Sequence, residues 1–169
     1  MNKIRTLFFT LLLITGCEKD DICSAETATT PKLILRFYDI SDQEETKAVP
    51  NLLVYGLNSI NEVVLFDHIG LSASNTDSIS IPLKTTDNVT RFALHRNFEN
   101  DNFETGNADI LSANYVGEEI YVSRACGFKN VFNNFAINLE SDSQNWVINS
   151  EIIYTTINNE TAAHVKIFH

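Results

Sequence analysis

The chain has 169 residues, of which 44% are hydrophobic, and it carries a formal net charge of −10. This length fits a single domain, and the apolar content is enough for a buried core. The acidic balance repels phosphate backbones, so nucleic acid is not an expected partner. The predicted division is a signal peptide at residues 1–16, a lipidated N-terminus and tether at 17–30, and one domain at 31–169.

The N-terminus has the layout of a bacterial lipoprotein signal. Lys3 and Arg5 supply positive charge, an apolar run follows, and small residues stand immediately before Cys17. The run has about half of the roughly 20 residues that a membrane-spanning helix needs, which favours cleavage before Cys17. Acyl chains on Cys17 would then hold the protein on a membrane, and attachment would rest on this anchor alone. The alternative is an ordinary secretory signal whose Cys17 later joins a disulfide.

Charged residues follow the anchor directly. Lys19, Asp20 and Asp21 resemble the export signal that sends lipoproteins of Bacteroidota to the outer face of the outer membrane. A solvated linker is the alternative interpretation of the same charges. The predicted location is the cell envelope, lipid-anchored at the outer membrane, with surface exposure as the sharper form of the prediction.

Two further cysteines remain, Cys23 near the mature start and Cys126 late in the chain. Two leftover cysteines in an exported chain favour a disulfide between them, which would staple the tether to the domain. Two free thiols or a thiol-based active site are the alternatives. Neither cysteine has the neighbouring histidine or the CxxC spacing that is typical of a reactive thiol.

The body of the chain alternates between apolar and polar residues with a period of two, and clusters of Asn, Asp, Ser and Gly separate the alternating runs. No window favours a long helix. The pattern predicts an all-β fold, an antiparallel β-sandwich that is immunoglobulin-like or transthyretin-like. The candidate strands are 32–38, 52–57, 63–66, 78–83, 91–95, 110–115, 119–125, 135–139, 146–155 and 164–168, and the candidate turns are 41–47, 72–77, 97–107 and 140–145.

Polar candidates for chemistry are few. Arg124 could recognise a carboxylate, or it could brace the fold on loop carbonyls or on Asp39. The segment 99–109 is rich in oxygen ligands for calcium, but Phe103 interrupts the alternation of an EF-hand loop, so a solvated hairpin loop is favoured. No cofactor or metal is predicted. The histidines are scattered and are expected at the surface or at strand ends: His68, His95, His164 and His169.

Trp146 is the one tryptophan. A single tryptophan in a strand is more often a core residue, although an exposed ring could stack on a sugar. The sequence contains no nucleophile elbow, phosphate loop or dinucleotide fingerprint, so an enzyme is not expected.

Several segments together resemble a lipoprotein family of Bacteroidota defined as a domain of unknown function (domain of unknown function 6452). They are Cys17–Cys23, Thr30–Asp39, Leu83–Thr85, Val122–Lys129, which contains Ser-Arg-Ala-Cys-Gly, and His164–Ile167. The resemblance covers essentially the whole chain. It implies an exported lipoprotein with a largely β domain and no assigned activity.

The leading functional prediction is an outer-membrane-anchored lipoprotein that serves as a non-enzymatic interaction or accessory module, with a membrane and a protein of the envelope as partners. The alternative is a surface module that binds a glycan or another nutrient. A third hypothesis, a hydrolase, requires residues that assemble only in space.

Overall fold

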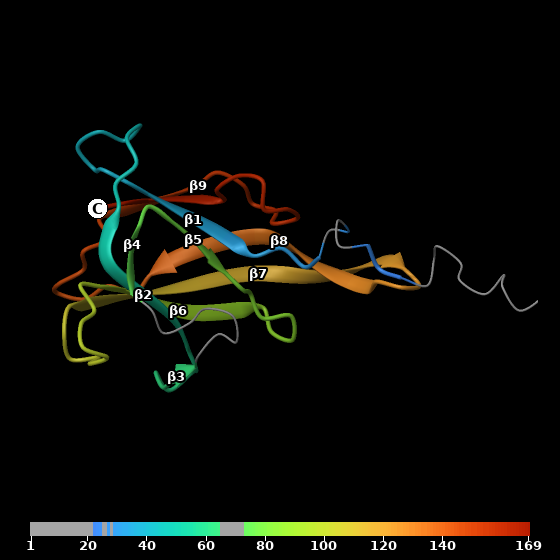
Figure 1. Ribbon diagram of the computed structural model, residues 1–169, viewed down its shortest axis with the longest axis horizontal. Helices are drawn as coiled ribbons and strands as arrows, with labels where there is room; N and C mark the ends of the chain where they lie inside the picture. Colours follow the sequence, from blue (N-terminus) through green and yellow to red (C-terminus); the bar gives the residue numbers. More distant parts are fainter. Residues whose placement is uncertain (1–21, 25–26, 28, 65–72) are drawn as a thin grey trace, which may run out of the picture.

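The predicted all-β architecture is what the chain adopts in the computed structural model, which describes residues 22–24, 27, 29–64 and 73–169 (Figure 1). Several runs of alternating polarity became strands close to their predicted bounds. In chain order, the described strands are β1 (Leu33–Tyr38), β2 (Val49–Leu57), β3 (Val63–Val64), β4 (Ser74–Thr76), β5 (Ser78–Ile81), β6 (Val89–Arg96), β7 (Asn107–Ser123), β8 (Gly127–Leu139), β9 (Asn149–Ile152) and β10 (Val165–Phe168).

The strands form two sheets that pack as a sandwich. One sheet has the order β5-β1-β10-β9, and the other has the order β3-β2-β6-β7-β8, with β4 paired to β2. The pairing is antiparallel except between β1 and β10, which run parallel with Leu35 opposite Val165. Parallel neighbours need a crossover connection, and here nearly the whole domain provides it.

Alternation along the strands builds the core between the sheets. In β1, Leu33, Leu35 and Phe37 are fully buried, whereas Arg36 between them is exposed. A buried side chain of this size contributes roughly 1.5 to 3 kcal/mol relative to its exposed state. The facing layer and the adjoining strand supply Phe92, Leu94, Leu111, Ala113, Val165 and Ile167.

Four predicted elements differ from the structure. The candidates 110–115 and 119–125 belong to a single strand, β7, which continues to Ser123. The predicted turn at 72–77 contains β4, and the predicted strand at 146–155 is reduced to β9. Of the predicted strand at 63–66, residues 63–64 form β3 and the remainder lies outside the described residues.

The hairpin of β7 and β8 extends beyond the sandwich as a projecting arm, residues 119–130, outward of the buried Val131 and Phe132 (Figure 1). The alternation of burial in β7 ends at Tyr115, and residues 116–121 are exposed on both faces of the ribbon. Five extended residues from Glu119 to Ser123 span roughly 16 Å. No sheet covers this part of the hairpin, so it stands apart from the core.

Candidate functional site

The outer end of the arm, residues 120–129, is named here the tip. Its turn follows Ser123, whose Oγ accepts a hydrogen bond from the backbone N–H of Cys126 at 3.1 Å. Gly127 closes the turn with a φ of 68°, a conformation that L side chains rarely adopt. A Cβ atom at Gly127 would meet nothing within 4 Å, so the backbone angle and not the available space accounts for the glycine.

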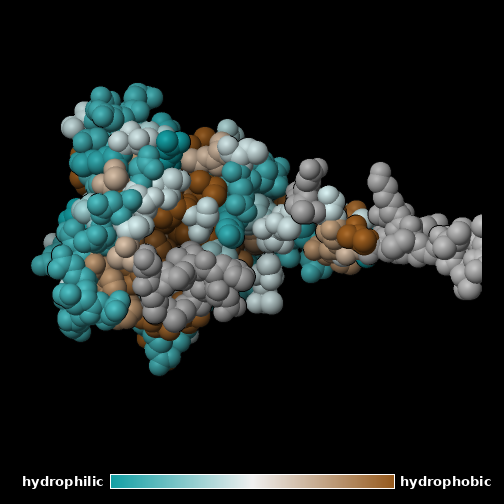
Figure 2. Space-filling model, viewed as in Figure 1, coloured by the Kyte–Doolittle hydropathy of each residue, from teal (hydrophilic) through white to brown (hydrophobic). Residues whose placement is uncertain are grey.

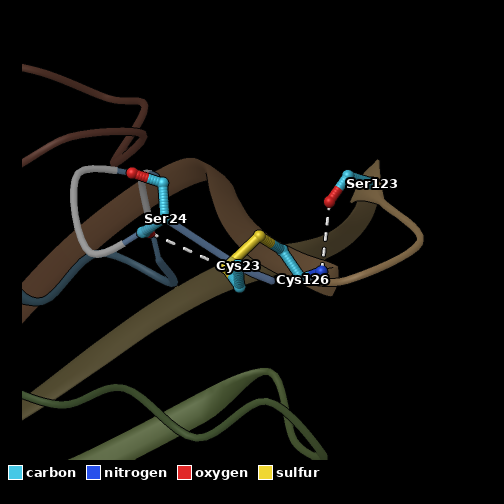
Figure 3. Close-up of a disulfide and its surroundings, with 4 residues drawn as sticks. All are labelled: Cys23, Ser24, Ser123 and Cys126. Atoms are coloured by element: carbon cyan, nitrogen blue, oxygen red, sulfur yellow. Dashed lines mark hydrogen bonds between the residues drawn. A yellow bond between two sulfur atoms is a disulfide. The ribbon is translucent and has the colours of Figure 1, made fainter. Parts of the chain in front are cut away.

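A disulfide joins the tip to the N-terminal tether. Cys23 and Cys126 are 103 residues apart in sequence, and their Cα atoms lie 4.8 Å apart across the bond (Figure 3). The predicted pairing is therefore present, and neither sulfur is a free thiol. Farther along the tether, the Oγ1 of Thr30 accepts a hydrogen bond from the backbone N–H of Asn130 at 2.9 Å. These two contacts hold the tether against the arm.

Two aromatic rings lie side by side next to the disulfide. Tyr121 and Phe128 are directly opposed in the β7–β8 register, and their ring centroids are 5.4 Å apart in an edge-to-face arrangement. Both rings are largely exposed, Tyr121 by 57% and Phe128 by 64%. In Figure 2, hydrophobic atoms gather at the projecting end of the molecule. Sequence reasoning missed this pair, because a register shift between Tyr121 and Ser123 places Phe128 opposite Tyr121, where regular pairing outward from Gly127 would place it opposite Val122.

Arg124 lies exposed in the turn of the tip. The predicted brace between Arg124 and Asp39 is wrong, because Asp39 pairs instead with Lys47 at 3.1 Å. Hydrogen bonds from the hydroxyl of Ser41, from its backbone N–H and from Lys47, in decreasing order of effect, lower the pKa of Asp39 to about 2. Among the described residues, neither Arg124 nor Lys129 forms an ion pair.

Trp146 is a core residue. Its ring is 5% exposed, its indole N–H donates a hydrogen bond to the carbonyl of Leu94 at 3.2 Å, and the guanidinium of Arg96 lies 5.3 Å from the ring centroid. The ring therefore presents no open face to a sugar.

The oxygen-rich segment 99–109 is only partly the solvated loop that was expected. Asp109 is fully buried, and its Oδ2 accepts hydrogen bonds from the backbone N–H groups of Trp146 and Val147. Burial raises the pKa of Asp109. Phe103 packs edge-on against Tyr55 and Phe98. In the described part of the chain, no group of three or more His, Cys, Asp or Glu side chains could hold a metal ion.

The three described histidines lie at strand ends, as one of the two expected positions has it, because His95 is next to the end of β6 and His164 and His169 flank β10. None of the three lies at the surface. His95, His164 and His169 are 2%, 3% and 8% exposed, and a ring nitrogen of each hydrogen-bonds a backbone carbonyl. Such bonds compensate the burial of a polar ring. Burial lowers the pKa of His164 and of His169. His68 lies outside the described residues.

A shallow cleft of about 470 Å³ lies beside β9. Tyr154, which is half exposed, lines it together with Asn158, Asn159 and His164. The Nδ1 of His164 accepts a hydrogen bond from the backbone N–H of Ile34, and Nε2 bonds the carbonyl of Asn159. Both ring nitrogens are thus occupied, so the cleft offers hydroxyl, amide and aromatic contacts and no free histidine base.

The predicted signal peptide, Cys17, and the charged residues Lys19, Asp20 and Asp21 lie outside the described residues. Within the described ranges, no helix has the length and apolar character required to cross a bilayer.

Comparison with protein families gives a match over residues 51–169 to a family model described as a family of unknown function (DUF6452). No curated protein and no solved structure matches the chain.

Proposed function

The chain belongs to the DUF6452 family, whose model matches more than half of its length, and we propose that it is a lipoprotein anchored in the outer membrane that serves as a non-enzymatic interaction or accessory module. The observation that carries the proposal is the order of charge, apolar run, small residues and Cys17 at the N-terminus. In this proposal, acyl chains on Cys17 hold the protein, and Lys19, Asp20 and Asp21 direct it to the outer face.

The connection between tether and arm supports this arrangement. Six residues lead from Cys17 to Cys23, and an extended chain of that length reaches at most about 20 Å. Cys23 is bonded to Cys126 at the tip, so an anchor at Cys17 would stay near the end of the arm. The sandwich would stand away from the lipid, with its surface open to a partner.

The described histidines give no support to the hydrolase hypothesis. His95, His164 and His169 are buried and hydrogen-bonded to backbone carbonyls, which leaves them poorly placed for proton transfer to a substrate.

Metabolic labelling with an alkyne fatty acid tests the anchor, in a host that processes lipoproteins. We expect label on the wild-type chain, no label on Cys17→Ala, and full label on the matched control Cys23→Ser/Cys126→Ser. Mass spectrometry should identify residue 17 as the acylated first residue. An unlabelled wild-type chain, or label that persists in Cys17→Ala, contradicts the proposal.

The second candidate is a surface module that binds a glycan or nutrient, and the cleft beside β9 favours it. A half-exposed tyrosine flanked by asparagines and threonines has the composition of a sugar subsite, in which a ring stacks and amides hydrogen-bond. On an oligosaccharide array, Tyr154→Ala should lose binding that Tyr121→Ala, another exposed tyrosine, retains. Equal binding by both variants rules out this cleft as the ligand site.

A further inference from the structure

The tip differs in chemistry from the rest of the protein. The whole chain has 22 acidic and 12 basic residues, yet residues 120–129 contain Arg124 and Lys129 and no acid. On the same short hairpin end, Tyr121 and Phe128 expose their rings, and Ile120 is 38% exposed. The tip is therefore a small surface that is both apolar and basic, bordered on β7 by the exposed acids Glu118 and Glu119, on a molecule that is otherwise acidic.

The position of the tip is set by covalent bonds. The Cys23–Cys126 disulfide makes the tip the part of the described domain that is tied most closely to the N-terminus. Thr30, which follows Cys23 along the tether, contacts Asn130 on the side of the tip toward the sandwich. The tether thus enters the domain at the tip and continues from there toward β1 (Figure 1).

We propose that the tip is a second membrane contact, in which Tyr121 and Phe128 enter the boundary between headgroups and acyl chains while Arg124 and Lys129 meet anionic headgroups. This rests on the proposed anchor at Cys17, and it changes the expectation that attachment depends on the anchor alone. Tyrosine is enriched at the level of the headgroups, and basic side chains are attracted to anionic lipid. With two points of attachment, the arm would hold a defined angle to the membrane.

A lipid surface is the occupant that the observations favour. The tether keeps Cys23 within about 20 Å of any bilayer that holds Cys17. The tip is therefore at a high effective concentration with respect to lipid. The positive charge of the tip suits anionic headgroups, while the acidic remainder of the protein would be repelled by them.

Tryptophan quenching in vesicles tests the proposal with the full, lipidated chain. Phe128→Trp places a reporter on the tip, and Phe103→Trp is the matched control, because Phe103 is a half-exposed ring in the β6–β7 loop at the opposite end of the molecule from the arm (Figure 1). Trp146 is buried and contributes the same background to both variants. Tyr121→Trp is a second reporter on the tip, should Phe128→Trp not fold.

The vesicles contain phosphatidylethanolamine, phosphatidylglycerol and brominated phosphatidylcholine. We expect bromine to quench the tip reporter at least twofold more than the control, with a blue shift of its emission. Adding the substitutions Arg124→Gln and Lys129→Gln should reduce this quenching in the vesicles that contain the anionic lipid phosphatidylglycerol. The same substitutions should leave the quenching unchanged in neutral vesicles made without that lipid. Equal quenching of both reporters in vesicle-bound protein overturns the membrane contact of the tip and leaves the proposed anchor at Cys17 standing. A blue shift without quenching assigns the tip to a protein contact and overturns it as well. Protein that does not float with the vesicles contradicts the anchor, and the tip proposal fails with it.

Discussion

At the scale of single residues, His164 shows how a polar ring is accommodated in the core. Nδ1 accepts the backbone N–H of Ile34 at 2.9 Å, so Nε2 carries the proton and donates to the carbonyl of Asn159. Protonation of Nδ1 would break the bond to Ile34, which joins β1 to the segment before β10. Neutral His164 is therefore part of the native structure.

The stability of the protein should fall as the pH falls through the range in which His164 titrates. Burial lowers its pKa in the folded state below the ordinary value of 6.5, so the unfolded chain binds the proton more readily. The stabilisation is complete above pH 6.5 and is lost toward the folded pKa. His164→Ala should cost about 1 to 3 kcal/mol at pH 7.5, because it leaves the N–H of Ile34 unpaired.

Urea unfolding at pH 7.5 and pH 5 measures this effect. The gap in free energy of unfolding between wild type and His164→Ala should be narrower at pH 5. His169 titrates in the same direction but is present in both proteins, so it cancels in the comparison. A gap of the same size at both pH values would show that His164 is not the titrating group.

Residues of similar kind were not equally predictable from the sequence. The Cys23–Cys126 pair was predicted by counting cysteines in an exported chain, because assigning Cys17 to the anchor leaves two. The burial of His95 and Asp109 did not follow, since both are polar and are compensated by carbonyl or N–H groups from distant segments. Only the folded chain shows those partners.

At the scale of elements, the β7–β8 hairpin is the most distinctive feature. Its inner part alternates because one face lies on the core, and this part was predicted from residues 110–115 and 135–139. The outer part of the hairpin shows no alternation in burial, because both of its faces meet solvent. For this reason the sequence pattern indicated two separate strands where the structure has one long strand. The arm is held by ladder hydrogen bonds and by the disulfide at its tip.

Removal of the disulfide should destabilise the protein. The bond closes a loop of about 100 residues, for which the chain-entropy model gives roughly 4 to 5 kcal/mol. We expect Cys23→Ser/Cys126→Ser to lower the free energy of unfolding by up to that amount and to expose the tether to proteases, while far-UV circular dichroism stays close to wild type.

The control for this comparison is Ser123→Ala, which removes the hydrogen bond to the backbone N–H of Cys126 and keeps the disulfide. Its effect should be about 1 kcal/mol. An unfolding midpoint of the double serine variant equal to that of wild type would mean that the bond does not constrain the unfolded chain.

At the scale of the whole molecule, the last strand completes the smaller sheet. β10 lies between β1 and β9 and is parallel to β1, so the beginning and the end of the domain are joined. Strand periodicity predicts that residues 164–168 are extended, but it carries no information about which strand lies beside them. Alternation shows which side chains of a strand face the core, but it does not show which strands lie along its two edges. Long-range packing decides these neighbours.

The sequence by itself predicted the strand content and the pairing of Cys23 with Cys126, because each depends on local pattern or on residue counting. It is also the basis of the anchor that we propose at Cys17. The tertiary structure decided which polar residues are buried, which strands are neighbours, and that Tyr121, Phe128 and Arg124 share one projecting tip. These features arise from contacts between segments far apart in the chain, where the free energy depends on which surfaces meet and not on the order of residues within either segment.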